Sequence, residues 1–587
     1  MQHLQGKKLA GVLVPAFALR RVGDLGIGDT QAVKESIEFC ARNQIGVLQL
    51  LPVNETGGDN SPYNAVSAIA LDPALLTIAP NTVPGLTEES FHQLATPDVL
   101  QKAGAASIDY PFVKKLKLDL LRLAFANFLA EAQANSPANR AFAAFQKDNQ
   151  DWLASYALFR ALVDEQGGNT TWTLWDKPLQ KPETARQWLL DSQHSARLKN
   201  DIEFWSYVQW LASRQWDEVR ACADAAHIAL MGDIPFGVSR YSADVWANQA
   251  LFDLSWCGGA PPEKFFQGDE FTRTWGQNWG IPLYNWQAHK QEGFTWWQSR
   301  IAHTVRYFHY FRIDHVLGFF RIYAFPWQPE KNQEFTHLSE AQAKALTGGR
   351  LPKFIAGDDS TPASALANEA QGKELLTTII EAAGSARVIA EDLGVIPNYV
   401  RPLLKQLGIP GFSIPIFERQ PDYNFKPKET FPPLNLCTYG THDHEPLASY
   451  YEHLVSWWHG PDGDNGWREV QRLAKFLSLD ANQAPTEYTQ SLQFAFFKAL
   501  LQSPCWLAVL MITDLLGTKQ RFNEPGLAGD YNWSQRLDKP LDQYEIDDRY
   551  ANKISYFKQL IIETDRAISP ELVRMQQRAA NPKEMKN

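Results

Sequence analysis

The feature that most constrains the fold of this chain is a series of short apolar runs, each followed by a polar loop and then by a helical pattern. The runs recur at residues 9–14, 46–51, 228–231, 310–313, 388–390, 436–439 and 506–512. Apolar strands that alternate with helices are typical of a parallel sheet covered by helices on both faces. Because the runs extend along most of the chain, they favour an eightfold barrel with insertions over a compact doubly wound sheet.

The alternative, a doubly wound nucleotide-binding sheet, predicts a glycine-rich phosphate turn directly after the first strand. No such turn follows Val14, and the glycine-containing stretch 24–29 is too short to be that fingerprint. A length of 587 residues would fit about four average domains. The strand pattern instead predicts an α/β fold built on one (β/α)8 TIM barrel with inserted, mainly helical subdomains.

The stretch between the second and third apolar runs has a different pattern. Apolar residues recur there at helical spacing, along 113–130 and again along 151–162. We therefore expect four parts. Residues 1–84 would form the start of the barrel and 85–205 a helical inserted subdomain. Residues 206–570 would form the remainder of the barrel, and 571–587 a frayed charged tail.

Composition excludes several classes of partner. The net charge is -10 with a sequence pI near 5.8, and no cluster of Lys and Arg appears, which disfavours a nucleic-acid partner. No apolar run of about 18 residues is present, so we expect no membrane span. The five cysteines are far apart and contain no CxxC pair. This spacing favours reduced thiols, a cytoplasmic location and no zinc site.

Acidic residues follow the ends of five of the predicted strands. In a barrel these positions meet at the C-terminal face, where active sites are built. The acids are Asp233, Asp314, Glu391, Asp443 and Asp514.

Two of these acids have a second charged residue close by in the sequence. Arg312 and Asp314 lie two apart on one predicted strand, so both point the same way, and the cation would hold Asp314 ionised as a nucleophile requires. The spacing alone fits a structural ion pair slightly better. Glu391 precedes Asp392 at a strand end, where a raised pKa would suit a proton donor. It fits equally well a helix N-terminal acid stabilised by the macrodipole.

His442 and Asp443 end a further run, and His and Glu follow them. This grouping could hold a metal, but its spacing matches no strong signature, and we expect no metal. Asp443 together with Asp314 and Glu391 fits glycoside chemistry instead. Retention of configuration needs a carboxylate nucleophile and a carboxylic acid donor about 5–5.5 Å apart. A third acid can bind sugar hydroxyls and help to distort the ring.

Aromatic residues make up 12% of the chain and include 20 Trp. Such an excess fits either a large core or a surface that stacks flat ligand faces, sugar rings among them. Seven of the Trp lie between residues 246 and 297. We therefore expect the excess to cover a cleft in part, with several of these side chains in the core.

These residues resemble a known family, the amylomaltase or disproportionating-enzyme type of 4-α-glucanotransferase. Each matching block is weak alone, but ten in the same order are specific, and they reach from the N-terminus to about residue 536 apart from the helical insertion. The blocks are 24–29, 51–52 with 60–64, 232–235, 242–246, 259–262, 276–284, 312–315, 390–394, 440–443 and 521–526.

The resemblance implies a retaining double displacement that transfers α-1,4-glucan segments from malto-oligosaccharides to the 4-hydroxyl of glucose or of a glycogen-type glucan. Asp314 would form the covalent β-glycosyl enzyme, and Glu391 would be the acid and then the base. Asp443, with His442 and Arg312, would bind the ring at the cleavage subsite. No cofactor is implied, since the covalent intermediate keeps the energy of the glycosidic bond.

The same match predicts further substrate-binding residues. Ser61 and Tyr63 would touch donor or acceptor sugars. Gln277 and Trp279 would lie in a cleft-covering loop around 250–290, and Asp392 and Asn523 would line the cleft.

Three stretches depart from the family pattern, at 55–60, 236–240 and 444–446. All three would border the cleft, so they affect subsite preference rather than the reaction class. The first rival function is an α-glucan hydrolase on the same barrel with the same acids. The second is a non-catalytic glucan-binding protein, against which the three acids together argue.

Overall fold

The computed structural model describes residues 6–80, 82–130, 136–191, 195–262, 269–525, 529 and 531–568. The expected frayed tail at 571–587 lies outside these described residues. Within them, eight strands form one parallel sheet with the order β10-β11-β12-β1-β2-β3-β6-β9. The strands are β1 (Leu9–Leu13), β2 (Val47–Gln49), β3 (Ala229–Ile234), β6 (Tyr310–Ile313), β9 (Arg387–Ala390), β10 (Phe412–Ser413), β11 (Leu436–Cys437) and β12 (Leu507–Met511).

The sheet is a nearly closed barrel, which confirms the predicted (β/α)8 fold. Its two end strands, β9 and β10, approach each other where the N–H of Ala390 donates to the carbonyl of Pro410 at 2.8 Å. All seven predicted runs coincide with barrel strands. The sequence pattern missed β10, because Pro410 and Pro415 flank its two residues and prevent them from extending into a longer apolar run.

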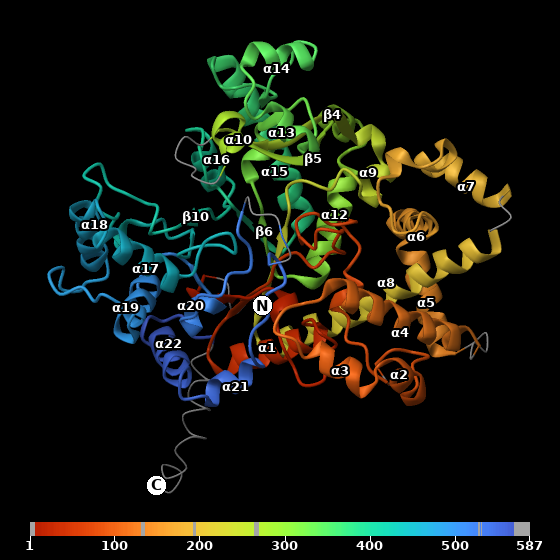
Figure 1. Ribbon diagram of the computed structural model, residues 1–587, viewed down its shortest axis with the longest axis horizontal. Helices are drawn as coiled ribbons and strands as arrows, with labels where there is room; N and C mark the ends of the chain where they lie inside the picture. The colour runs from red at the N-terminus through yellow and green to blue at the C-terminus, as the bar shows by residue number, and fades with distance from the viewer. Residues whose placement is uncertain are drawn as a thin grey trace, which may run out of the picture.

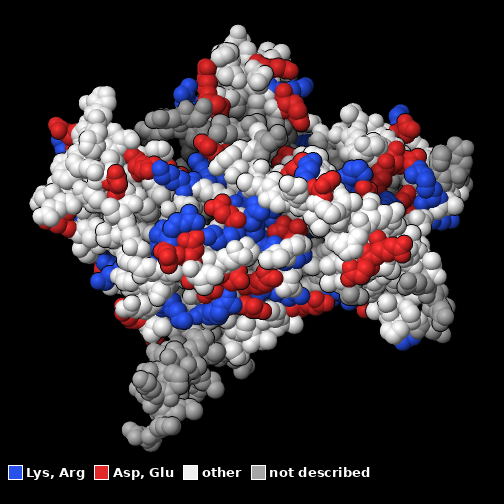
Figure 2. Space-filling model, turned by 60° about the horizontal axis from the view of Figure 1, so that its bottom comes forward, with Lys and Arg blue, Asp and Glu red and all other residues white. Residues whose placement is uncertain are grey.

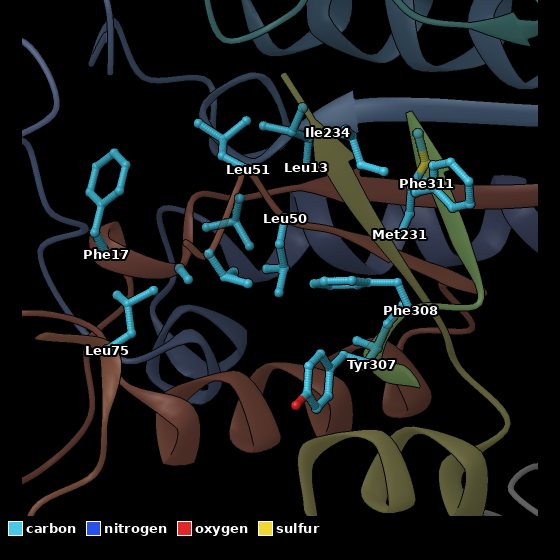
Figure 3. Packing of buried hydrophobic residues seen from close by; sticks show 14 of the residues in the cluster. Leu13, Phe17, Leu50, Leu51, Leu75, Met231, Ile234, Tyr307, Phe308 and Phe311 are labelled. Atoms are coloured by element: carbon cyan, nitrogen blue, oxygen red, sulfur yellow. The ribbon is translucent and has the colours of Figure 1, made fainter. Parts of the chain in front are cut away.

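Figure 3 shows buried hydrophobic side chains from several strands packed together. The register places Leu13 and Met231 on the face of the sheet that also carries Arg312, and Phe311 on the other face, and these three hydrophobic residues are at most 3% exposed. Gly232 lies on the same face as Phe311, where a Cβ would lie 2.6 Å from the ring of Phe308. The strands are therefore covered by packed side chains on both faces, and the chemistry has to be at their ends.

Helices surround the barrel (Figure 1). The first of them begins at Asp29, whose side chain accepts the N–H of Ala32 and caps the helix. The helices outside the segment between β2 and β3 include α1 (Thr30–Arg42), α12 (Thr295–Tyr307), α15 (Pro362–Ala383), α16 (Val400–Gln406), α17 (Leu447–Trp458), α18 (Gly463–Phe476), α19 (Gln490–Leu501), α20 (Ile512–Leu516), α21 (Leu541–Ile546) and α22 (Ala551–Glu563).

The segment between β2 and β3 is helical and forms the lobe on the right of Figure 1. Its last helix has 32 residues, and residue 205, the expected end of the inserted subdomain, falls inside this helix. The lobe and the barrel therefore share one continuous helix. The helices are α2 (Glu88–Leu94), α3 (Pro97–Ala103), α4 (Tyr110–Ala130), α5 (Pro137–Asp148), α6 (Gln150–Glu165), α7 (Pro182–Asp191) and α8 (Ser195–Ala226).

A second sheet, which the sequence pattern did not predict, lies above the barrel in Figure 1. Part of the stretch around 250–290, expected to be a cleft-covering loop, forms two of its strands. All neighbouring strands in it are antiparallel. In sheet order they are β5 (Gln277–Tyr284), β4 (Phe252–Ala260), β7 (Ile322–Phe325) and β8 (Lys353–Ile355).

Two surface properties bear on partners. None of the helices in the described parts of the chain combines the length and the apolar character that crossing a membrane requires. On the face drawn in Figure 2, Lys and Arg side chains lie among Asp and Glu side chains. On that face, charges of opposite sign therefore compensate one another locally.

Candidate active site

A cavity of about 930 Å³ lies at the C-terminal ends of the barrel strands. Residues that follow β3, β6, β9 and β11 line it from below, and residues of β4 and β5 line it from the second sheet. The acids Asp314, Glu391 and Asp443 all face this cavity. The topology therefore brings together three residues that are up to 129 positions apart in the sequence.

Asp314 and Glu391 occupy equivalent places at the ends of neighbouring strands. The strands pair up to Ile313 and Ala390, so the two acids are the first residues beyond the paired ends. The N–H of Glu391 also donates to the carbonyl of Ile313 at 3.0 Å. Neighbouring strands lie about 4.8 Å apart, close to the carboxyl separation of about 5–5.5 Å that retaining glycoside chemistry uses.

Arg312 binds the carboxylates of two of the strand-end acids. Its Nε donates to Asp233 at 3.0 Å and its Nη2 to Asp314 at 2.5 Å. The Arg312 and Asp233 side chains are at most 3% exposed, whereas the Asp314 side chain is 32% exposed to the cavity. The expected structural ion pair is thus present, and it also fixes an accessible carboxylate at the cavity wall.

Glu391 has the environment of a proton donor. Burial, reinforced by the charge of Asp314, raises its pKa to about 7, although Arg312 and an N–H donor oppose this shift. The donor is the backbone N–H of His315, 2.8 Å from Oε2. Residue 315 has a left-handed backbone with φ 45°. The alternative of a helix N-terminal acid does not apply, because the next helix begins at Val400.

Asp443, which follows β11, is held ionised in the same cavity. Burial opposes ionisation, but the imidazole of His442 and a hydrogen bond from Asn523 outweigh it, so the pKa of Asp443 lies below its ordinary value. Asn523 Nδ2 lies 2.6 Å from Oδ1, and His442 Nε2 lies 3.3 Å from the same oxygen. Arg521 donates to the backbone carbonyl of Asp443 at 2.6 Å. This carboxylate is therefore fixed in position and available to sugar hydroxyls.

Tyr63 contacts both Asp233 and His442, the neighbour of Asp443 in the sequence. Its hydroxyl donates to Asp233 at 2.6 Å, and its ring stacks on His442 with centroids 4.8 Å apart. Trp533 packs at a tilt against both rings, 5.9 and 5.7 Å away. All three rings line the cavity, but His442 and Trp533 are buried, so the partly exposed ring of Tyr63 offers most of the apolar surface to a sugar ring.

The remaining predicted cleft residues divide between cavity and interior. Ser61, Gln277 and Trp279 line the cavity together with Asn523. Trp279 lies on β5 rather than in a loop; its indole N–H donates to Gln277 and its ring is 39% exposed. Asp392 does not face the cavity.

The carboxylate of Asp392 is turned toward the missed strand β10. It accepts the N–H of Phe412 at 2.7 Å and Nε of Arg401 at 2.9 Å, and the residue is 1% exposed. Its role is to bridge the end strands of the barrel, so the expectation that it lines the cleft has to be corrected. Asp514 is also buried, and it accepts the N–H of Leu447.

The grouping that could have suggested a metal site in the sequence consists of His442, His444 and Glu445. His444 Nδ1 is bonded to the backbone and hydroxyl of Thr441, and Glu445 pairs with His453. The described residues contain no group of three or more His, Cys, Asp or Glu side chains that could hold a metal ion.

Sequence reasoning assigned no role to two residues that border the carboxylates. Asp233 was recognised only as an acid at a strand end, although it anchors both Tyr63 and Arg312. Trp533 comes from a stretch without strand or helix periodicity, and no sequence signal would have found it. The Trp excess also proved to be largely core, since Trp246, Trp275, Trp296 and Trp297 are buried.

The fold and this site define a class: an enzyme that acts on glycosidic bonds through paired carboxylates at the top of a (β/α)8 barrel. The comparisons with known proteins specify it further. The sequence pattern of a family described as 4-alpha-glucanotransferase matches residues 14–542. The chain belongs to this 4-alpha-glucanotransferase family.

Individual relatives agree with this assignment over nearly their whole length. The 4-alpha-glucanotransferase of Thermus thermophilus is 32% identical, over 88% of this chain and 92% of that protein. That of Chlamydia pneumoniae is 29% identical, over 93% and 94%. Among solved structures, amylomaltase from Streptococcus agalactiae in complex with acarbose has a TM-score of 0.73 at 23% identity and covers 96% of this chain and all of that one.

Proposed function

We propose that the protein transfers α-1,4-glucan segments from malto-oligosaccharide donors to the 4-hydroxyl of glucose or glucan acceptors, glycogen-type glucans included, by a retaining double displacement. The observation that carries this proposal is the adjacency of Asp314 and Glu391 at the paired ends of β6 and β9. One carboxylate is bound by a guanidinium, and the other has a pKa of about 7. This division suits a nucleophile and an acid.

In the first step Asp314 attacks the anomeric carbon of the donor. A bond forms between that carbon and a carboxylate oxygen, while the bond to the leaving 4-oxygen breaks. Glu391 gives its proton to this oxygen and becomes ionised. Asp443 and His442 bind the ring as positive charge develops at the anomeric carbon, where a fixed negative group is stabilising.

In the second step the 4-hydroxyl of the acceptor attacks the glycosyl enzyme. Glu391 takes its proton, and Asp314 leaves as a carboxylate, so the resting state is restored. Water at ~55 M competes for the same intermediate, and transfer prevails only if the acceptor is bound and water is excluded. Aromatic rings at the cavity, such as Tyr63 and Trp279, suit this task because they bind sugar faces at variable register.

The proposal extends to substrate contacts and location. Ser61, Gln277 and Asn523 line the cavity with polar groups that suit sugar hydroxyls, and we assign them to substrate binding. All five cysteines are free. Free, mostly buried thiols support the proposal of a cytoplasmic enzyme.

Incubation with maltotriose tests the function. A transferase gives longer oligosaccharides together with free glucose, whereas a hydrolase gives shorter sugars alone. The expected result is a ladder above the trisaccharide in the wild type and none with Asp314→Asn. A wild-type reaction without products longer than maltotriose would refute the proposal.

A further inference from the structure

The segment 54–66 connects the helical lobe to the active site, and we call it the cleft segment. On one side it supplies Ser61, Tyr63 and Asn64 to the wall of the cavity. A bridge between Thr56 and Ala65 closes the middle of the segment into a loop, and a second bridge joins Asn54 to Leu71. The chain between Thr56 and Ala65 has no regular strand or helix, and side-chain hydrogen bonds from Lys114 and to Asp59 add to its few backbone hydrogen bonds.

Helix α6 anchors the start of the cleft segment through a buried carboxylate. Glu55 is 6% exposed, and it accepts the hydroxyl of Tyr156 at 2.6 Å. Arg160, one turn further along the same helix, brings its Nε to 3.2 Å from the other carboxylate oxygen. Burial raises the pKa of Glu55, and the charge of Arg160 opposes the shift. A buried carboxylate with two partners on one helix is a fixed point rather than a mobile contact.

Helix α4 holds the turn that follows. The ammonium of Lys114 lies 3.3 Å from the carbonyl of Thr56, 3.0 Å from that of Gly57 and 3.4 Å from Oδ1 of Asn60. An ammonium has three donors, and these three acceptors use all of them. Asn60 has a left-handed backbone with φ 59°, a conformation that Asn adopts more readily than most residues. Lys114 therefore holds the turn in the conformation that precedes Ser61 and Tyr63.

The contacts leave room behind the segment. A cavity of about 200 Å³ lies between it and the lobe, lined by Glu55, Thr56, Lys114 and Arg160 among others. The turn is consequently held by a few polar contacts rather than by close packing. Loss of the Lys114 contacts would let it move away from the substrate cavity.

We infer that the helical lobe, through Lys114 and the Tyr156–Glu55 contact, positions the cleft segment for sugar binding. Lys114 is in this sense a positioning residue: it touches no substrate and acts through Ser61 and Tyr63. The inference deepens the proposed function and rests on it, since it assumes that the cavity binds glucan. It also gives the lobe a role in the affinity for substrate rather than in the chemical step.

The test compares KM and kcat of four proteins on maltotriose: the wild type, Lys114→Met, Lys114→Arg and Lys115→Met. Lys115 is the matched control, because it is the next residue of α4, is exposed and pairs with Asp119 on the same helix. We expect Lys114→Met to raise KM about tenfold with kcat within about twofold, and Lys114→Arg to recover most of the loss. Lys115→Met should match the wild type.

Equal KM values for Lys114→Met and Lys115→Met would overturn the inference, as would a fall in kcat at unchanged KM. If Lys114→Met does not fold, Tyr156→Phe removes a single oxygen from the other anchor, and the same change in KM decides. The proposed function is judged separately, by whether the wild type forms products longer than maltotriose. If the wild type only hydrolyses, that function fails, and the KM comparison on hydrolysis still decides the inference.

Discussion

Asp314 and Glu391 follow the paired ends of neighbouring barrel strands, and the charge of Asp314, second only to burial, raises the pKa of Glu391 to about 7. The nucleophile therefore keeps the acid protonated until the first step consumes its charge. Once Asp314 carries the sugar, it is neutral, and the pKa of Glu391 must fall. The same residue is then a base when the acceptor arrives.

Replacing Asp314 by Asn keeps the shape of the side chain and removes the nucleophile. Turnover of maltotriose should fall by several orders of magnitude, on the order of 10⁴-fold or more, while binding of maltoheptaose persists. Turnover is measured by glucose release and binding by calorimetry. Asp422→Asn, at an exposed turn, is the control and should behave as the wild type. Full turnover in Asp314→Asn would contradict the mechanism.

The pH dependence follows from the protonation of Glu391. The first step needs the protonated acid, so kcat/KM should fall tenfold per unit above about pH 7. Glu391→Gln should lose most activity on maltotriose, yet still react with α-maltosyl fluoride, whose leaving group needs no proton. Fluoride release by that variant should be independent of pH above 7. If fluoride release by Glu391→Gln still declines above pH 7, a group other than Glu391 causes the alkaline decline.

The same shift affects stability. Glu391 has a pKa of about 7 in the folded protein against 4.5 as an ordinary carboxyl. The protonated form is favoured in the fold, so its stabilisation is complete below about pH 4.5 and is lost as the pH rises toward 7. Glu391→Gln should thus be more stable than the wild type at pH 8, by up to about 3 kcal/mol, and closely similar at pH 4. Denaturant titrations at the two pH values measure this difference. A gain that is the same at both pH values would contradict it.

The barrel and the three acids were predictable because each signal is local. Apolar runs of four or more residues identify β1, β3 and β6, and an acid directly after a strand is placed by the topology itself. The two-residue strand β10 carries no such signal. Its absence explains the error at Asp392, whose carboxylate is satisfied by Phe412 on that strand.

Other features depend on contacts that sequence spacing does not encode. Tyr63 and Asp233 are 170 positions apart and meet only in the folded chain. The antiparallel sheet that carries Trp279 pairs β4 with β7 across about 65 residues, and its first pairing contains register shifts that disrupt strict alternation. Long-range pairing with irregular register leaves little trace in the period of a single strand.

Asn523 should affect the ionisation of Asp443 rather than the chemistry directly. Its amide donates to Asp443 and helps to keep the pKa of that carboxyl low. Asn523→Ala should raise this pKa, so the loss of kcat/KM on acidification should begin at a higher pH than in the wild type, while kcat/KM near pH 7 changes little. Profiles between pH 3.5 and 7 measure the shift, with Asn424→Ala at an exposed turn as the control. A uniform loss of activity without a shift of the acidic decline would indicate a purely steric role.

Trp279 should control the balance between transfer and hydrolysis. The residue is 39% exposed and lines the cavity, and its ring packs edge-to-face with His315 at a centroid distance of 4.8 Å. Trp279→Ala should weaken acceptor binding and admit water, so the ratio of transfer to hydrolysis on maltotriose should fall about tenfold, while fluoride release from α-maltosyl fluoride changes less. Trp457→Ala is the matched control, because Trp457 is 41% exposed on α17 and does not line the cavity. If both variants keep the wild-type ratio, an aromatic surface at this position does not exclude water, and acceptor binding must rest on the polar residues of the cleft segment.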